Sequence, residues 1–141
     1  MSDANVDRKA SEDDLKVVQS FYDSLDRGDV PGVLALLDPQ VRWTEAEGFP
    51  YYSGTWVGPD AVLNNLLKRV AEDWSSFGAR SERMLVDGPT IVSLGVYTGT
   101  HKVTGKNMRA EFAHLWTVDR QKITSFKMYA DTAKVIEAMR I

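Results

Sequence analysis

The stretch from Ala110 to Asp131 carries two titratable side chains in apolar surroundings. Apolar and polar residues alternate along it, which predicts two long strands joined by a tight turn at residues 119–121. Because side chains alternate between the faces of a strand, His114 falls within an apolar row and Asp131 closes the second strand. Burial raises the pKa of a carboxylate toward neutrality, where the group can both accept and donate a proton. His114 and Asp131 are therefore the candidate catalytic residues of an acid/base site.

Each of these two residues also has a structural interpretation. Asp131 precedes Thr132, where a closing helix is expected to begin, and aspartate is a good N-cap. If the two strands pair through the predicted turn, Asp131 lies opposite about Arg109, and an ion pair there would lower the pKa of Asp131. In the same register His114 lies opposite about Phe126, away from Asp131. A core histidine that is hydrogen-bonded to a backbone carbonyl fits this pattern equally well.

Length, charge and composition narrow the class of protein. The chain has 141 residues, enough for one domain with one core, and its net charge of -3 offers no basic surface for nucleic acid or for membrane lipids. It contains no cysteine and only two histidines, which argues against a metal site, and neither a metal nor a cofactor is expected. No apolar run approaches the about 20 residues of a membrane span. The polar, acidic start is unlike a signal peptide, so a cytoplasmic location is the expectation.

The order of the predicted elements indicates an α+β fold. The residue patterns predict helices at about Glu12 to Arg27, Val30 to Leu37 and Pro59 to Asp73, a strand at Val41 to Glu45, four strands after Phe77, and a helix from Thr132 to Arg140. A run of helices followed by a run of strands predicts a curved, mainly antiparallel sheet packed against helices. Residues 1–10 are expected to form a disordered tail, and residues 11–141 the folded domain.

The loop expected after the first strand, A-E-G-F-P-Y-Y-S-G-T-W-V-G-P, is rich in aromatic residues. Exposed loops seldom carry so many aromatic side chains, so we expect this loop to plug one end of the core or to form the mouth of a pocket. A sheet curved around three helices encloses a cavity that suits a small ligand. The candidate substrate-binding residues in its lining are Trp43, Glu45, Tyr52, Trp56, Tyr97, Phe112 and Tyr129. Taken singly, the aromatic residues are also typical of a core or a dimer interface. Glu45 is also typical of an acidic residue in a solvated loop.

Two longer motifs frame the chain: W-T-E-A-E-G-F-P-Y-Y-S-G-T-W-V-G-P-D-A-V, before and into the third expected helix, and A-E-F-A-H-L-W-T-V with K-I-T-S-F-K-M-Y-A-D-T-A near the end. Together they resemble the SnoaL-like branch of the NTF2-like superfamily. The resemblance implies a cone-shaped roll, in which three N-terminal helices pack on a curved sheet around an internal cavity. It implies much less about activity, because this fold hosts many functions.

Different enzymes of this superfamily imply different sites for the chain. In the cyclases an aspartate at the end of the last long strand is the acid/base and a histidine lies in the pocket, and Asp131 and His114 match these places. In the steroid isomerase the base ends the first strand, where Glu45 stands here without an apparent acidic donor for an oxyanion. The epoxide hydrolase uses an Asp-Arg-Asp set, for which Arg109 and Asp131 are candidates, but the middle strand lacks the other aspartate.

The resemblance implies two alternative functions. The first is a cofactor-independent acid/base enzyme of the cyclase or isomerase type, which acts on a small apolar or aromatic carbonyl compound. The second is a non-catalytic ligand-binding or dimerisation module. Apolar side chains occur on both faces of the last strand, with Phe126 and Met128 opposite Tyr129, and suggest a homodimer formed through the sheet. Neither nucleic acid nor a membrane is an expected partner.

Overall fold

The computed structural model describes residues 2–141, with side chains from Glu12 onward. In chain order the elements are α1 (Ser2–Asp26), α2 (Val30–Ala35), β1 (Leu37–Thr44), β2 (Thr55–Val57), α3 (Pro59–Val62), the π-helix η1 (Leu63–Leu67), α4 (Lys68–Asp73), β3 (Trp74–Asp87), β4 (Thr90–His101), β5 (Asn107–Asp119), β6 (Lys122–Ala130) and α5 (Thr132–Met139). The strands of these described residues form one sheet in the order β2-β1-β6-β5-β4-β3, in which only the β1–β6 pair is parallel. The predicted α+β fold with a mainly antiparallel sheet is confirmed.

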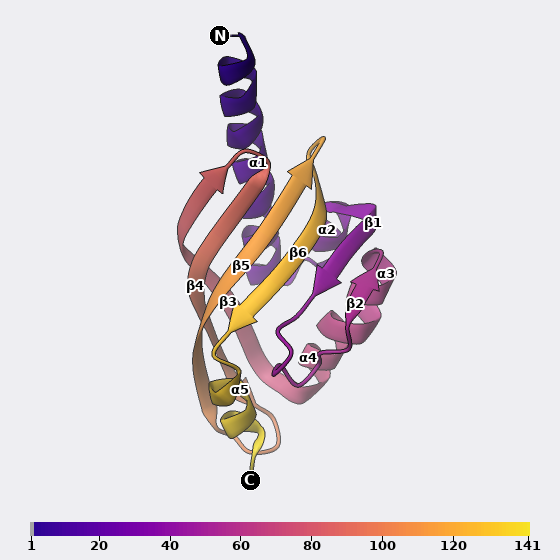
Figure 1. Ribbon diagram of the computed structural model, residues 1–141. Coiled ribbons are helices and arrows are strands. Elements are labelled where there is room, and N and C mark those ends of the chain that lie inside the picture. The colour runs from indigo at the N-terminus through magenta and orange to yellow at the C-terminus, as the bar shows by residue number, and fades with distance from the viewer. Residues whose placement is uncertain (1) are drawn as a thin grey trace.

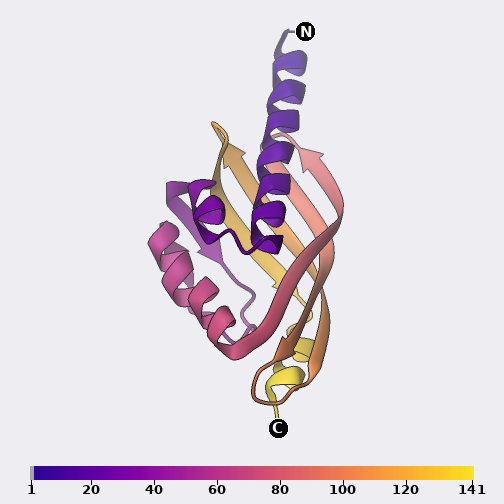
Figure 2. The same ribbon diagram turned by 180° about the vertical axis from the view of Figure 1, so that it is seen from behind.

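Helices α1 to α4 cover one face of this sheet and leave most of the other face open, while α5 packs against β5 and β4 at one end of the sheet (Figure 1). Figures 1 and 2 show α1 and α2 together with α3 and α4 on the same side, with the long strands β3 to β5 curving around α1. Gly95 lies within β4 where the curvature brings β3 close, because a Cβ there would lie 2.1 Å from the carbonyl oxygen of Arg80. Only glycine fits such an approach, which explains the glycine inside this strand. None of the described helices is long and apolar enough to cross a membrane.

Two local predictions are confirmed closely. The third expected helix runs over Pro59 to Asp73 as the consecutive segments α3, η1 and α4. The turn between β5 and β6 uses Arg120 and Gln121, whose φ angles of 51° and 63° are both in the left-handed region. A two-residue hairpin turn of this kind matches the twist of its strands, and it lets β5 and β6 pair along most of their length.

Three predicted boundaries are wrong, and strand pairing explains each of them. The second helix ends before Leu37, because Leu37 pairs with Ile123 of β6 and begins β1. Part of the expected aromatic loop forms β2, which pairs with β1. β3 begins at Trp74, which pairs with His101, rather than after Phe77. Tertiary pairing therefore overrides the helical or loop pattern of these short segments.

The first two helices meet at a well-defined junction. α1 begins at Ser2, before the predicted start at Glu12, and so includes residues for which the sequence predicts a disordered tail. The division of the chain into tail and domain stays a prediction. Gly28 follows α1 with a φ of 69°, and Asp29 caps α2 by accepting a hydrogen bond of 3.0 Å from the amide of Gly32. This junction positions one side of the candidate site.

Candidate functional site

A cavity of about 360 Å³ lies between the helices and the inner face of the sheet. Its wall contains a set of aromatic side chains: Phe21, Trp43, Phe49, Trp74, Phe77, Tyr97 and Phe126. Among the described residues of the lining, Asp29 and Glu45 carry the carboxyl groups, and no lysine or arginine is present. A cavity of this volume and composition suits a small organic ligand.

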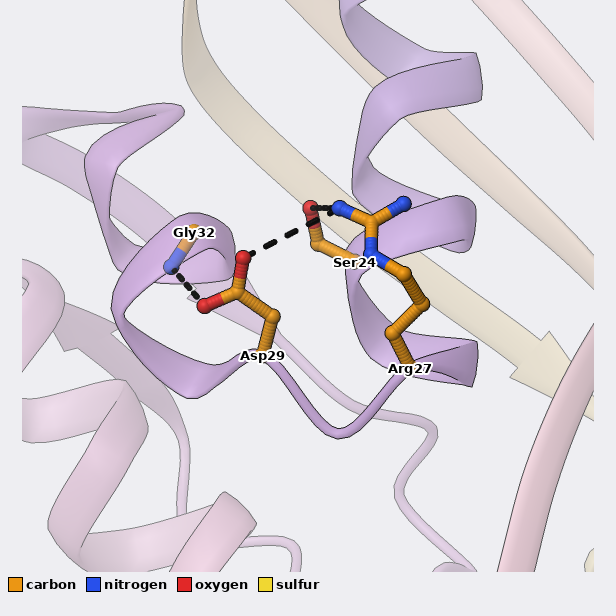
Figure 3. A network of polar contacts seen from close by, with 4 residues as sticks. All are labelled: Ser24, Arg27, Asp29 and Gly32. Atoms are coloured by element: carbon orange, nitrogen blue, oxygen red, sulfur yellow. Dashed lines mark hydrogen bonds and ion pairs between the residues drawn. The ribbon is translucent and has the colours of Figure 1, made fainter.

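The mouth of the cavity lies between the α1–α2 junction and the start of β3. Exposed members of the lining gather there: Gly28, Val30, Ala71, Ser75 and Ser76. Figure 3 shows how local contacts hold the α1–α2 side of this mouth, with Asp29 bonded to the Gly32 amide and its Oδ2 3.8 Å from the guanidinium of Arg27. Arg27 also donates a hydrogen bond of 3.4 Å to Ser24. The charges at the mouth are thus partly paired with each other, and both members of the ion pair are solvent-exposed.

Glu45 follows β1 directly and exposes only 4% of its surface. The indole of Trp43 donates a hydrogen bond of 3.1 Å to Oε1. Oε2 is the one buried side-chain polar atom without a hydrogen-bond partner in the described part of the chain. Burial raises the pKa of Glu45 to about 7, although the hydrogen bond from Trp43 acts in the opposite direction. A carboxyl group with this pKa can take up and release a proton near neutral pH.

His114 is buried between two tyrosine hydroxyls. The hydroxyl of Tyr22 lies 2.6 Å from Nδ1, and the hydroxyl of Tyr97 lies 2.5 Å from Nε2. Phe112 stacks on the imidazole, with ring centroids 3.8 Å apart. Burial holds the pKa of His114 well below its ordinary value, so the ring is neutral at pH 7. The two ring nitrogens therefore bond to hydroxyl groups, and not to the backbone carbonyl of the structural interpretation.

The structure brings some of the predicted site residues together and separates others. Those that line the cavity are Trp43, Glu45, Tyr97 and His114. Phe112 and Trp56 are buried but lie outside the lining, whereas Tyr52 and Tyr129 expose 38% and 52% of their surfaces. Phe49 of the aromatic loop reaches the cavity wall and is 4% exposed. The loop therefore closes the side of the cavity, and the mouth lies elsewhere.

Asp131 lies away from this cavity. β6 ends at Ala130, which pairs with Phe112, and Asp131 is the N-cap residue of α5. Its side chain is exposed and receives no capping hydrogen bond from α5. The ion pairs recorded among the described residues do not include one with Arg109. The structure thus places Asp131 at the start of a helix and His114 in the cavity wall.

The register of β5 and β6 explains why these residues separate. His114 pairs with Met128 rather than with about Phe126, because the turn has two residues and β6 contains one extra residue, Thr124, near it. Cross-strand partners share a face, so Met128 is on the inner face with His114 and is fully buried. Tyr129, one residue further, is then on the outer face. The face of β6 that was predicted to line the cavity is the outer one, and this prediction is wrong.

Tyr22 is a residue of the site that sequence reasoning missed. It stands in the apolar stripe of α1, where its ring is part of the core and 7% of its surface is exposed. A buried tyrosine in such a stripe needs a polar partner for its hydroxyl, and this requirement was a usable signal. Its partner His114 is 92 positions further along the chain, so only the tertiary structure identifies the pair.

Comparisons with known proteins agree with this geometry. The model of the SnoaL-like domain family matches residues 18–126, while none of the proteins with curated functions matches the sequence. An NTF2-like protein from Burkholderia thailandensis E264 is 33% identical, with a TM-score of 0.86 over 91% of this chain and 98% of that protein. An NTF2-like protein of unknown function from Burkholderia pseudomallei K96243 is 29% identical, with a TM-score of 0.84 over 92% and 98% of the two chains.

A third similar structure contains a ligand. TerC, co-crystallised with polyporic acid, is 21% identical to this chain and has a TM-score of 0.81 over 90% of this chain and 98% of its own. At this identity the likeness concerns the fold alone. Together the three structures confirm the predicted NTF2-like roll.

Proposed function

Because this chain belongs to the SnoaL-like domain family and its cavity contains one deeply buried carboxyl group, we propose that it is a cofactor-independent acid/base enzyme of the cyclase or isomerase type. Its substrate in this proposal is a small apolar or aromatic carbonyl compound. The observation that carries the proposal is the buried, unpartnered Oε2 of Glu45 in the cavity wall. Such an oxygen is costly to bury unless a ligand or a proton completes its contacts.

In the proposed reaction Glu45 is first the base and then the acid. Its carboxylate removes a proton from the carbon next to the carbonyl group, and the electron pair of the C–H bond moves toward the carbonyl oxygen to form an enolate. The protonated Glu45 then returns the proton to another atom of the same compound, or to the oxygen formed when the enolate closes a ring. A pKa of about 7 makes both forms of Glu45 available at neutral pH. Glu45 thereby takes the role that the resemblance assigned to Asp131, which lies outside the cavity lining.

Proton transfer can be tested without the natural substrate. Wild-type protein in D2O is mixed with a panel of apolar ketones that includes 1-tetralone, and NMR follows deuterium incorporation next to the carbonyl group. We expect catalysed exchange, and a loss of about 100-fold or more in Glu45→Gln, which keeps the side-chain size and an acceptor for Trp43. Exchange at the wild-type rate in a folded Glu45→Gln protein would contradict the proposal.

A non-catalytic ligand-binding module is the second candidate function. The aromatic wall of the cavity supports it, as does the binding of polyporic acid by a protein of the same fold. The same ketone panel separates the two functions. Binding of ketones by the wild-type protein with no deuterium exchange would favour the module over the enzyme.

We also propose a homodimer that forms through the open face of the sheet. Leu94, Leu115 and Tyr129 lie on the neighbouring strands β4, β5 and β6, and expose 37%, 37% and 52% of their surfaces. Exposed apolar groups on adjacent strands are typical of an interaction surface. Light scattering should give twice the chain mass of 15.8 kDa, and Leu115→Lys should lower it to that of one chain. A monomeric wild-type protein at micromolar concentration would be evidence against the dimer.

A further inference from the structure

Two groups of buried hydrogen bonds lie between the centre of the sheet and the cavity. The indole of Trp116 donates a hydrogen bond of 2.9 Å to the hydroxyl of Ser93. The hydroxyl of Tyr22 bonds to Nδ1 of His114, and Nε2 of His114 bonds to the hydroxyl of Tyr97. These residues are all buried, and Tyr97 and His114 also line the cavity. The proposed function uses none of these hydrogen bonds.

The direction of each of these hydrogen bonds follows from the donors and acceptors that its groups carry. An indole N–H can only donate, so the oxygen of Ser93 accepts from Trp116 and its own proton remains free to be donated. Tyr22 is buried and lies outside the cavity lining, whereas Tyr97 lines the cavity and can direct its own proton into it. A buried hydroxyl needs an acceptor for its proton, and Nδ1 of His114 lies within hydrogen-bond distance of the hydroxyl of Tyr22. We therefore assign Tyr22 as the donor to Nδ1 of His114.

The neutral state of His114 extends this direction to Tyr97. In a neutral imidazole one nitrogen accepts and the other donates. With Nδ1 accepting from Tyr22, the Nε2–H group donates to the oxygen of Tyr97. The hydroxyl proton of Tyr97 is then not donated to His114. Because Tyr97 is in the cavity wall, that proton is available to a ligand.

We propose that Tyr97 donates a hydrogen bond to a carbonyl oxygen of the ligand, and that His114 is the positioning residue that orients Tyr97 through its Nε2–H tautomer. The inference rests on the proposed function for the identity of the ligand oxygen. In the enolate formed by Glu45 the same oxygen becomes negatively charged, and a preorganised donor stabilises it more strongly than it stabilises the ketone. The site therefore selects a neutral compound that carries an acceptor oxygen.

The charges in the cavity agree with a neutral ligand. Burial raises the pKa of Tyr97 well above its ordinary value, and the nearby carboxylate of Glu45 raises it further, so Tyr97 retains its proton at neutral pH. Among the described lining residues Asp29 and Glu45 provide the carboxyl groups, and no cationic side chain balances them. An anionic ligand would be repelled. A neutral ketone can accept a hydrogen bond from Tyr97 while the C–H group next to its carbonyl carbon contacts Glu45.

The tautomer of His114 can be measured directly. Long-range proton–nitrogen NMR on the full chain at neutral pH distinguishes the two tautomers and the charged ring, and His101→Asn identifies the signals of the second histidine. We expect a neutral ring that is protonated on Nε2. A proton on Nδ1, or a charged His114, would overturn the inference. This measurement needs neither ligand nor turnover, and it reports the direction of the hydrogen bonds between His114 and the two tyrosines.

A matched pair of ligands tests the donor. Isothermal titration calorimetry compares 1-tetralone with tetralin, which has the same rings but no carbonyl oxygen. The wild-type protein should bind 1-tetralone about 10-fold more tightly, the size of one additional hydrogen bond, and Tyr97→Phe should remove this preference. Tyr51→Phe is the control, because Tyr51 is another buried tyrosine but lies outside the lining. A wild-type protein without the preference, or Tyr97→Phe with it, would overturn the inference.

Failure of the proposed reaction at Glu45 and failure of the donor assignment at Tyr97 would give different results. If wild-type protein exchanges no deuterium but shows the Nε2–H tautomer and the ketone preference, the proposed reaction fails and the donor assignment stands. If exchange depends on Glu45 but is unaffected by Tyr97→Phe, the reaction stands and the donor assignment fails. Deuterium exchange in Glu45→Gln and Tyr97→Phe tests the reaction, and the tautomer and the ketone preference test the donor assignment.

Discussion

Glu45 and Asp131 end neighbouring, parallel strands of the same sheet, yet their surroundings differ in the properties that decide acid/base chemistry. After Glu45 the chain folds back and Phe49 closes over the cavity, so that the carboxyl group is buried and has a raised pKa. After Asp131 the chain turns into α5, and the side chain stays exposed. A position at the end of a strand is thus insufficient for an acid/base group. The segment that follows the strand determines whether the carboxyl group is buried.

The largest expected effect is on proton transfer. Glu45→Gln should lower deuterium exchange by about 100-fold or more, because the group that moves the proton is removed. Asp131→Asn, the same type of substitution at the exposed position, should leave the exchange rate within about 2-fold of wild type, since Asp131 is not part of the cavity lining. NMR exchange rates of the two variants provide the comparison. The opposite ranking would return the catalytic role to Asp131.

The next effect is a pH-dependent stability that Glu45 confers. Its pKa rises from 4.5 in the unfolded chain to about 7 in the folded protein, so between these values the folded state binds more protons. Stability should be highest below the unfolded pKa and should fall by about 3 kcal/mol as the pH rises through 7. Urea unfolding of wild type and Glu45→Gln from pH 4.5 to 8 measures the difference. A constant difference between the two proteins would show that burial does not perturb Glu45.

A tyrosine in the interior and one on the outer face of the sheet should also differ in how much their hydroxyl groups contribute to stability. Tyr22→Phe leaves Nδ1 of His114 without its hydroxyl partner in a buried position, which should lower the free energy of unfolding by about 1–3 kcal/mol. Tyr129→Phe removes an exposed hydroxyl on the outer face and should change it by less than about 0.5 kcal/mol. Chemical denaturation measures both variants. Equal effects would remove the energetic distinction between the interior and the outer face.

The smallest effect is expected at the helix caps. Asp131→Ala should change the free energy of unfolding by less than about 0.5 kcal/mol, because the carboxylate makes no capping hydrogen bond to α5. Asp29→Ala should cost about 1 kcal/mol, because Asp29 accepts a hydrogen bond from Gly32 at the start of α2. Thermal unfolding of the two variants ranks them. A larger loss at Asp131 would support the capping interpretation of that residue.

Part of the fold was readable because it depends on local patterns. The helix from Pro59 to Asp73 has apolar residues at helical spacing, and the hairpin turn at residues 120–121 separates two alternating strands. The start of β1 at Leu37 was not readable, because it depends on pairing with Ile123, far along the chain. Leu36 and Leu37 fit a buried helix and a buried strand equally well in sequence.

The sequence predicted several residues of the candidate site but not how they are arranged. Trp43, Glu45, Tyr97 and His114 were predicted to belong to it and lie together in the cavity wall. Tyr129 was placed on the wrong face, because the inner face of β6 is set by its pairing with β5: Met128, the partner of His114, lies on the inner face, and its neighbour Tyr129 therefore lies on the outer face.

The sequence by itself determined the α+β class, the SnoaL-like resemblance, and the presence of carboxyl, imidazole and aromatic groups suited to a small-molecule site. The tertiary structure decided which carboxyl group is buried and which partners His114 has. The physical reason is that the pKa of a carboxyl group and the tautomer of a histidine depend on solvent exposure and on hydrogen-bond partners. For Glu45 and His114, these partners and neighbours are brought together by contacts between α1, the aromatic loop and the strands, and none of these contacts is encoded in a local pattern.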